Sequence, residues 1–151
     1  MDFKAFICAN TIAAPVPAVP EIRLMQATEI TPIWQATESE LQKAGVEPPF
    51  WAFPWAGGQA LARYVLDNPE IVSGRRVLDF ASGSGLVAIA AMKAGAASVT
   101  AVDIDSASIA AIEVNAELNQ VDINCLTEDL LSGAPPAETD VILAGDVCER
   151  P

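Results

Sequence analysis

The sequence has no histidine and only three cysteines among its 151 residues. The lack of histidine excludes Ser-His-Asp and Cys-His catalysis and removes the commonest metal ligand. Cys8, Cys125 and Cys148 are widely spaced and form no CxxC pair, so neither a zinc site nor a disulfide framework is indicated. We therefore expect no metal, and free, mostly buried thiols in a reducing cytoplasm.

Positive charge and long apolar runs are also scarce. Eight Lys and Arg residues stand against 20 Asp and Glu, which gives a formal net charge of −12. Nucleic acid is excluded as the main partner because phosphate binding needs a basic face. The acidity serves solubility, or it favours a basic substrate such as a lysine-bearing surface. No apolar run approaches the roughly 20 residues of a membrane span, and the proline-broken N-terminus is unlike a signal peptide. These absences predict a cytoplasmic protein without a membrane partner.

The first 70 residues predict an N-terminal arm and helical extension with an aromatic loop. Residues 1–20 carry prolines at alternate positions and predict an irregular arm, followed by a short strand at 21–25. Thr31-Pro32 predicts the start of a helix that ends at Gly45, and a second helix follows Gly57-Gly58 to about residue 66. Between them lies a proline-rich loop with four aromatic residues, which covers the core or, for Trp55 only, forms a lid over a ligand.

Residues 71–151 change to a regular alternation of strands and helices. We expect strands at 76–80, 98–102, 123–127 and 140–144, with helices at 85–93 and 105–119. Strand–helix–strand units at this spacing favour right-handed crossovers in a parallel sheet. The predicted fold is α/β, a doubly wound, mostly parallel, Rossmann-like sheet with helices on both faces.

The first of these strands leads through Ala81-Ser82-Gly83-Ser84-Gly85 directly into a helix. A glycine-rich turn at a helix N-terminus lets backbone approach a ligand closely. Written as Gly83-x-Gly85-x-x-Ala88, the turn also satisfies the dinucleotide fingerprint. The loop therefore predicts a nucleotide-type site without separating NAD from S-adenosylmethionine.

Three acids at successive strand ends are more specific than the glycines. Asp79 lies within the first strand, where the NAD fingerprint has an apolar residue, and a buried acid needs a partner. The ammonium group of an amino-acid-bearing cofactor is one such partner, and neighbouring loop amides are the alternative. Asp103 ends the second strand, where an acid receives ribose hydroxyls in doubly wound nucleotide sites. Asp129 follows the third strand, within reach of an adenine amino group.

These segments resemble a known family. The run VLDFASGSG is similar to methyltransferase motif I, AVDID to the ribose-binding segment and TEDL to the adenine-side segment. Upstream, PPFWAFPWAGGQALARYVLDNP resembles the electron-transfer-flavoprotein beta-subunit lysine methyltransferases, a branch of the class I (seven-strand) enzymes. The resemblance implies S-adenosylmethionine bound by Asp79, Asp103, Asp129 and the loop from Ala81 to Gly85, with Trp55, Gly57 and Gly58 over it. It also implies seven strands, so the C-terminal strands are apparently missing from this chain.

The resemblance further implies an Asp-x-x-Tyr segment beside the acceptor amine. Asp146 matches the acid and is the candidate catalytic residue, whereas Glu149 stands at the tyrosine position. The implied activity is methyl transfer to a lysine amine of a protein, with electron-transfer flavoprotein as the acceptor by resemblance. A ribosomal protein or a small-molecule amine is the alternative acceptor. An NAD-dependent oxidoreductase and a non-catalytic cofactor-binding module are the alternative functions.

Overall fold

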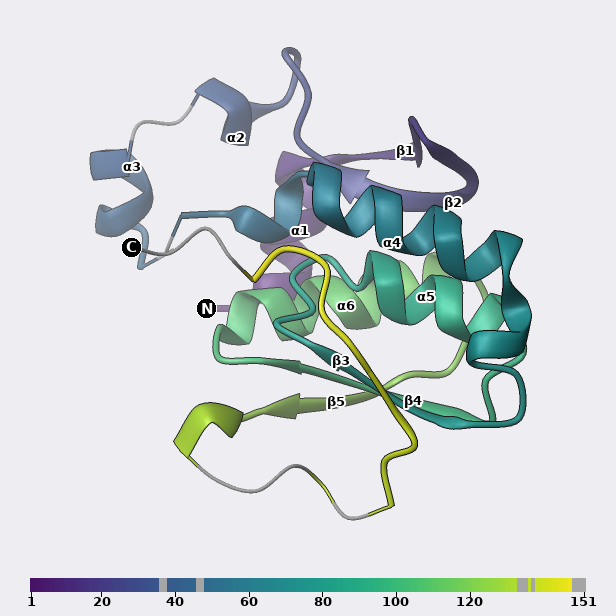
Figure 1. Ribbon diagram of the computed structural model, residues 1–151. Helices are drawn as coiled ribbons and strands as arrows, with labels where there is room; N and C mark the ends of the chain where they lie inside the picture. The colour runs from purple at the N-terminus through teal and green to yellow at the C-terminus, as the bar shows by residue number, and fades with distance from the viewer. Residues whose placement is uncertain (36–37, 46–47, 133–135, 137, 148–151) are drawn as a thin grey trace.

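The centre of the molecule is a parallel sheet, shown in Figure 1 in a computed structural model that describes residues 1–35, 38–45, 48–132, 136 and 138–147. The four strands of this sheet lie in the order β5-β4-β3-β6, and every neighbouring pair is parallel. Their positions agree with the predicted ones to within one or two residues, and the α/β class is confirmed. The strands are β3 (Arg76–Phe80), β4 (Ser98–Asp103), β5 (Asn124–Thr127) and β6 (Val141–Leu143).

Helices α5 (Leu86–Lys93) and α6 (Ser106–Leu118) pack against one face of this sheet, and α4 (Ala56–Asp67) lies on the same side, mainly against α5 (Figure 1). The expectation of helices on both faces is wrong for the described residues. The crossovers from β3 to β4 and from β4 to β5 run in the same direction along the sheet, so right-handed connections place both helices on the same side. The connection from β5 back to β6 contains the short 3₁₀ turn η3 (Leu130–Ser132) in place of a described α-helix.

The N-terminal arm is ordered, which corrects the prediction of an irregular segment. Helix α1 (Phe3–Asn10) begins after Asp2, whose side chain accepts a hydrogen bond from the Ala5 N–H at 3.1 Å. The strands β1 (Ile12–Val16) and β2 (Val19–Gln26) form an antiparallel hairpin. The prolines do favour extended backbone, as predicted, but the pairing of the two strands and the N-cap of α1 were missed.

The predicted helix over residues 31–45 is described as two pieces, α2 (Pro32–Gln35) and α3 (Glu38–Lys43). Ile33 and Leu41 are buried, as the apolar pattern requires, while Thr37 lies outside the described residues. Just before α2, the Thr31 hydroxyl accepts from the Thr28 N–H and donates to the Thr28 carbonyl. The predicted end holds, because Gly45 has a φ of 74° beyond the last turn of α3.

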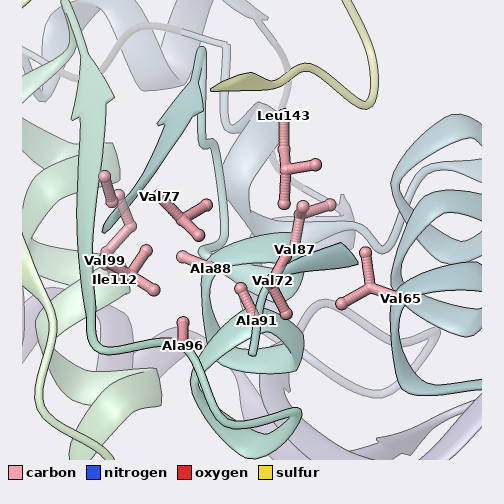
Figure 2. Close-up of a cluster of buried hydrophobic side chains, with 11 residues drawn as sticks. Val65, Val72, Val77, Val87, Ala88, Ala91, Ala96, Val99, Ile112 and Leu143 are labelled. Carbon is pink, nitrogen blue, oxygen red and sulfur yellow. The ribbon is translucent and has the colours of Figure 1, made fainter. Parts of the chain in front are cut away.

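Small side chains let α5 lie close against the sheet. Figure 2 shows Val87, Ala88 and Ala91 of α5 packed among valines from the strands, with Val65 from α4 on the far side. All residues from Leu86 to Ala91 are buried, so this helix is covered on every side. One of its neighbours is the N-terminal hairpin, because Val16, Ile22 and Leu24 share a buried cluster with Leu86, Ile89 and Ala90. The predicted boundary at residue 70 therefore runs through a shared hydrophobic core, and as a domain boundary it stays a prediction.

The cysteine expectation is only partly met. Cys8 and Cys125 are free thiols, as predicted, but Cys8 is exposed and Cys125 is partly exposed, so the expected burial is wrong for both. Cys148 lies outside the described residues. None of the described helices has the length and apolar character needed to cross a membrane.

Candidate functional site

A cavity of about 940 Å³ opens at the carboxyl ends of the parallel strands. The strand order reverses at β3, which has β4 on one side and β6 on the other. Open α/β sheets bind ligands at such a switch point. The cavity is lined by the segments that follow the four strands, by the aromatic loop and by α1. From these segments the lining includes Phe3, Phe50, Phe53, Trp55, Gly58, Asp79, Ala81, Gly83, Ser84, Asp103, Asp129, Leu131, Asp146 and Val147.

The glycine-rich loop turns sharply through left-handed backbone conformations. Ala81, Gly83 and Gly85 have φ values of 52°, 58° and 83°. Gly85 is the N-cap of α5, and a Cβ there would lie 3.1 Å from Ile112 of α6. The left-handed conformation therefore favours glycine at residue 85, and the close approach of Ile112 leaves little room for a side chain there. Gly85 itself is not among the cavity-lining residues; it turns the chain from the cavity wall into the helix.

Asp79 is buried, with 1% of its surface exposed, and it accepts two hydrogen bonds. Its Oδ2 lies 2.5 Å from the Ser82 hydroxyl and 3.1 Å from the backbone nitrogen of Ala88. Ala88 is the third residue of α5, so Asp79 takes the place of the side-chain cap that Gly85 lacks. Neighbouring loop amides are the alternative partner that the sequence predicts for Asp79. This alternative is met in part, because one of the two hydrogen bonds comes from a backbone amide, that of Ala88 in α5.

Burial raises the pKa of Asp79 to about 7. Removing a carboxylate from water disfavours its charged form, and the nearby Asp103 and Asp146 carboxylates add repulsion. The hydrogen bonds from Ser82 and Ala88 act in the opposite direction but are outweighed. Asp79 is therefore a buried acid that a cation in the cavity would stabilise in its ionised form.

Asp103 ties the loop after β3 to the loop after β4. Its Oδ2 accepts from the Gly83 N–H at 2.9 Å, and its Oδ1 accepts from the Asp105 N–H at 3.0 Å. The Gly83 amide, which a dinucleotide site would direct at a phosphate, is here bonded to a carboxylate. Each carboxylate oxygen has a second lone pair, so Asp103 keeps acceptor capacity toward the cavity.

Asp146 lies in the segment after β6, and its Oδ2 accepts from the Gly58 N–H at 2.7 Å. Gly58 is the third residue of α4, whose N-cap Trp55 supplies no side-chain cap. The contact is close: a Cβ on Gly58 would lie 2.8 Å from the same oxygen, and a Cβ on Gly57 would collide with the Gly145 carbonyl. Gly57 is not part of the cavity lining, so the structure explains it by this backbone approach.

The four aromatic residues of the loop divide into two groups. Trp51, in the 3₁₀ turn η1 (Phe50–Ala52), is 1% exposed and belongs to a buried cluster. Phe50, Phe53 and Trp55 line the cavity, and their ring centroids lie 6.2 Å (Phe50–Trp55) and 5.7 Å (Phe53–Trp55) apart. The Trp55 indole N–H donates to the Phe50 carbonyl at 2.8 Å. Trp51 thus covers the core, whereas Phe50, Phe53 and Trp55 line the cavity, and a lid formed by Trp55 over a ligand stays a prediction.

Asp129 lies at the outer side of the cavity. It is exposed, and its Oδ1 accepts from the Leu131 N–H at 3.0 Å at the start of η3. Glu149, the residue at the expected tyrosine position, lies outside the described residues. Phe3 of α1 also lines the cavity, and the sequence carried no signal for it, because contact between the N-terminus and the strand ends depends on tertiary packing.

The cavity lining is acidic. It contains six carboxylate side chains, and no Lys or Arg is present in it among the described residues. Such a lining attracts cations and repels anions. The described residues contain no group of three or more His, Cys, Asp or Glu side chains that could hold a metal ion. The six acids are Asp79, Asp103, Asp105, Glu128, Asp129 and Asp146.

Comparison with known proteins gives consistent matches. The family model for ribosomal protein L11 methyltransferase (PrmA) matches residues 59–147. The electron transfer flavoprotein beta subunit lysine methyltransferase of Xenopus laevis is 41% identical over 144 residues, covering 95% of this chain and 57% of that protein. The Danio rerio protein of that name is 42% identical over 148 residues, covering 97% of this chain and 56% of that protein. The chain thus spans about half the length of these relatives.

Solved structures show the same fold. The ribosomal protein L11 methylase from Lactobacillus delbrueckii subsp. bulgaricus is 39% identical with a TM-score of 0.50, and the match covers 58% of this chain and 45% of that one. The Thermus thermophilus 16S rRNA N2 G1207 methyltransferase (RsmC), solved in complex with AdoMet and guanosine, is 27% identical with a TM-score of 0.52. That match covers 60% of this chain and 25% of that one.

Proposed function

The chain belongs to the ribosomal protein L11 methyltransferase (PrmA) family, and from this premise we propose that its cavity binds S-adenosylmethionine for methyl transfer to a lysine amine of a protein. The observation that carries the proposal is the acidic cavity at the switch point of the sheet, with Asp79 and Asp103 on the two central strands and Asp146 in the segment after β6. The chain spans about half the length of its relatives. The methyl-transfer activity of the whole protein is therefore part of this proposal.

The cavity fits this cofactor in size and charge. Small-molecule sites span about 300–1,000 Å³, and this one measures about 940 Å³. S-adenosylmethionine carries a sulfonium and an ammonium group, and its sulfonium supplies the methyl group that is transferred. Six carboxylates and no described cation in the lining suit such a ligand.

We assign each acid of the site a partner on the cofactor. Asp79 would hold the ammonium group, because a buried carboxylate gains most from a cation. Asp103 would receive the ribose hydroxyls on the acceptor capacity that its two backbone contacts leave. Asp129 would contact the adenine amino group from the outer side. Trp55 and Gly58 lie on the wall nearest α4 and would cover the cofactor.

Asp146 would orient the acceptor amine. Methyl transfer by in-line displacement depends mainly on positioning and on a dry pocket, so a chain without histidine is suited to it. Only Oδ2 of Asp146 is bonded to a described residue, which leaves Oδ1 for the incoming amine. Phe50, Phe53 and Trp55 line the same cavity and would exclude water there.

A protein lysine is the acceptor that the relatives favour. Matches to the electron transfer flavoprotein beta subunit lysine methyltransferases reach 42% identity over 97% of this chain. The ribosomal protein L11 methyltransferase of Neisseria meningitidis serogroup C is 36% identical over 82% of it. Electron transfer flavoprotein is therefore the first acceptor to test, with ribosomal protein L11 as the comparison. A cytoplasmic location stays a prediction from composition, to be checked by cell fractionation.

The charge of the cavity disfavours the NAD-dependent alternative. A dinucleotide brings a pyrophosphate with two negative charges, which would meet the acidic lining. The Gly83 N–H that would bind a phosphate oxygen is already bonded to the Asp103 carboxylate. Membership of a methyltransferase family disfavours this alternative as well.

Two measurements test the proposal in order. Titration calorimetry with S-adenosylhomocysteine and with NADH compares the two cofactor classes, and failure to bind S-adenosylhomocysteine would refute the cofactor assignment. Incubation with methyl-labelled S-adenosylmethionine and candidate acceptor proteins then tests transfer. Binding without labelling of any protein in a cell lysate would identify a non-catalytic module instead.

A further inference from the structure

Asn115 is a fully buried polar residue behind the glycine-rich loop. It lies on α6, its exposure is 0%, and both ends of its side-chain amide are hydrogen-bonded. Its Nδ2 donates to the Ser84 carbonyl at 2.8 Å, and its Oδ1 accepts from the Met25 N–H at 2.8 Å. One side chain therefore joins the cofactor loop to strand β2 of the N-terminal hairpin.

Asn119, the C-cap residue of α6, helps to separate two roles of these asparagines. Its Oδ1 accepts from the Arg23 N–H at 3.1 Å, and its Nδ2 donates to the Arg23 carbonyl at 2.6 Å. Asn115 and Asn119 together thus bond alternate residues of β2 on the edge that β1 leaves free. Asn119 Nδ2 also donates to the Asn115 carbonyl at 2.7 Å, but of the two side chains Asn115 is the one that bonds the glycine-rich loop, at Ser84, so holding the hairpin does not explain its Nδ2 bond.

Ser84 is the point at which the loop most needs an external anchor. It lies between Gly83 and Gly85, both at positive φ, and glycine allows many other conformations. The Gly83 amide is anchored by Asp103 from the cavity side, and the Ser84 carbonyl by Asn115 from behind. These two bonds fix the orientation of two successive residues in the turn.

We propose that Asn115 is a positioning residue for the cofactor: it holds the Ser84 carbonyl so that the glycine-rich loop is preorganised for binding, and it couples the loop to the N-terminal hairpin. The inference rests on the proposed function. Asn115 is not among the residues that line the cavity, so it acts through Ser84. Preorganisation raises affinity because less conformational freedom is lost on binding.

The test compares Asn115→Asp with Asn119→Asp in the full chain. The first variant keeps an oxygen for the Met25 N–H but loses the donor to Ser84. The second keeps an oxygen for the Arg23 N–H and loses the donor to the Arg23 and Asn115 carbonyls, without touching the loop. We expect S-adenosylhomocysteine affinity, measured by calorimetry, to fall about tenfold for Asn115→Asp, the effect of one buried hydrogen bond. For Asn119→Asp we expect a change of less than about twofold.

If Asn115→Asp does not fold, Asn115→Leu serves as the second variant, because it adds no charge to the buried site. It is compared with Asn119→Leu, and thermal unfolding is recorded for all four proteins. A role confined to stability would lower affinity in proportion to the loss in Tm for both positions. A positioning role instead lowers affinity more for the residue 115 variants than for residue 119 variants with the same loss in Tm.

Hydrogen exchange on the unaltered protein gives an independent readout. Coupling through Asn115 is reciprocal, so bound S-adenosylhomocysteine should slow exchange of the Met25 amide more than that of the Arg23 amide. Equal affinities for the 115 and 119 variants, or a Met25 amide indifferent to the ligand, would overturn the inference while leaving the proposed function standing. No binding by the unaltered protein would overturn both.

Discussion

The Asp146 carboxylate caps helix α4 from outside the helix, through a hydrogen bond of 2.7 Å from the Gly58 N–H to Oδ2. Asp79 does the same for α5, through the Ala88 N–H. In each case a carboxylate at or just beyond a strand end bonds the third residue of a helix whose own N-cap has no side-chain cap. The two acids therefore serve folding as well as the site, and experiments must separate the two roles.

Gly58→Ala tests the close approach of α4 to the segment after β6. Replacing glycine by alanine inside a helix normally stabilises it by about 1 kcal/mol. Here the new Cβ would lie 2.8 Å from Asp146 Oδ2, which must shift and weaken its bond to the Gly58 N–H, so we expect the usual gain to be lost and the free energy of unfolding, measured with urea, to fall by up to about 1 kcal/mol. Ala60→Gly, at an exposed position of α4, is the control and should lose about 1 kcal/mol. A stabilised Gly58→Ala protein would contradict the packing.

Substitutions of Asp146 distinguish capping from catalysis. Asp146→Asn keeps an oxygen for the Gly58 N–H, so its Tm should stay close to that of the unaltered protein. Asp146→Ala loses the cap and about 1 kcal/mol of stability. Methyl transfer to the acceptor should fall at least about tenfold in both, because a bond between a carboxylate and an amine is worth about 1.5–3 kcal/mol. Full activity of Asp146→Asn would show that the charge has no role in transfer.

Asp103→Ala removes the carboxylate that bonds Gly83 and Asp105. We expect affinity for S-adenosylhomocysteine to drop about tenfold to a hundredfold, since a charge-assisted contact to the ribose and the anchor of the loop are lost together. Asp122→Ala removes the same charge at an exposed position away from the cavity and should bind normally. Calorimetry on both proteins gives the comparison, and normal binding by Asp103→Ala would refute the ribose assignment.

The sequence predicted the parallel sheet because its local signals agree with one another. The strand over 76–80, the turn at Gly83 and Gly85 and the following helix each carry their own pattern, and the structure follows them closely. The helix at 106–118 likewise begins after Asp105, whose side chain accepts from the Ala107 N–H. The α1 helix was missed because prolines at 15, 17 and 20 favour extended backbone, and the irregular arm predicted from them began at residue 1.

The candidate site was predictable in its composition but not in its internal contacts. The spacing of acids at strand ends indicated Asp79 and Asp103, and the family resemblance indicated Asp146; the structure places all three around one cavity. Nothing local indicated that Asp146 would bond a helix amide, or that Asn115 would reach Ser84, 31 residues away. Such contacts depend on how the helices pack on the sheet, and a single sequence does not encode that as a pattern.

Asp79 should make both stability and cofactor binding depend on pH. Its pKa in the folded chain is about 7, against about 3.9 for an unfolded aspartate, so the folded state binds the extra proton between these values. The contribution of Asp79 to stability is therefore greatest at low pH and is lost as pH rises from about 4 to about 7. Asp79→Asn can still accept from Ala88, and it should be less sensitive to pH over this range in urea unfolding.

Cofactor binding should show the opposite dependence on pH. A bound ammonium group favours the ionised carboxylate, so binding releases the proton of Asp79, and affinity for S-adenosylhomocysteine should rise as pH increases from about 6 to about 8. Calorimetry in two buffers of different ionisation enthalpy measures the released protons directly. Asp79→Asn should bind more weakly and release fewer protons. If both proteins release the same number, the ammonium group does not meet Asp79, and the buried acid serves only to cap α5.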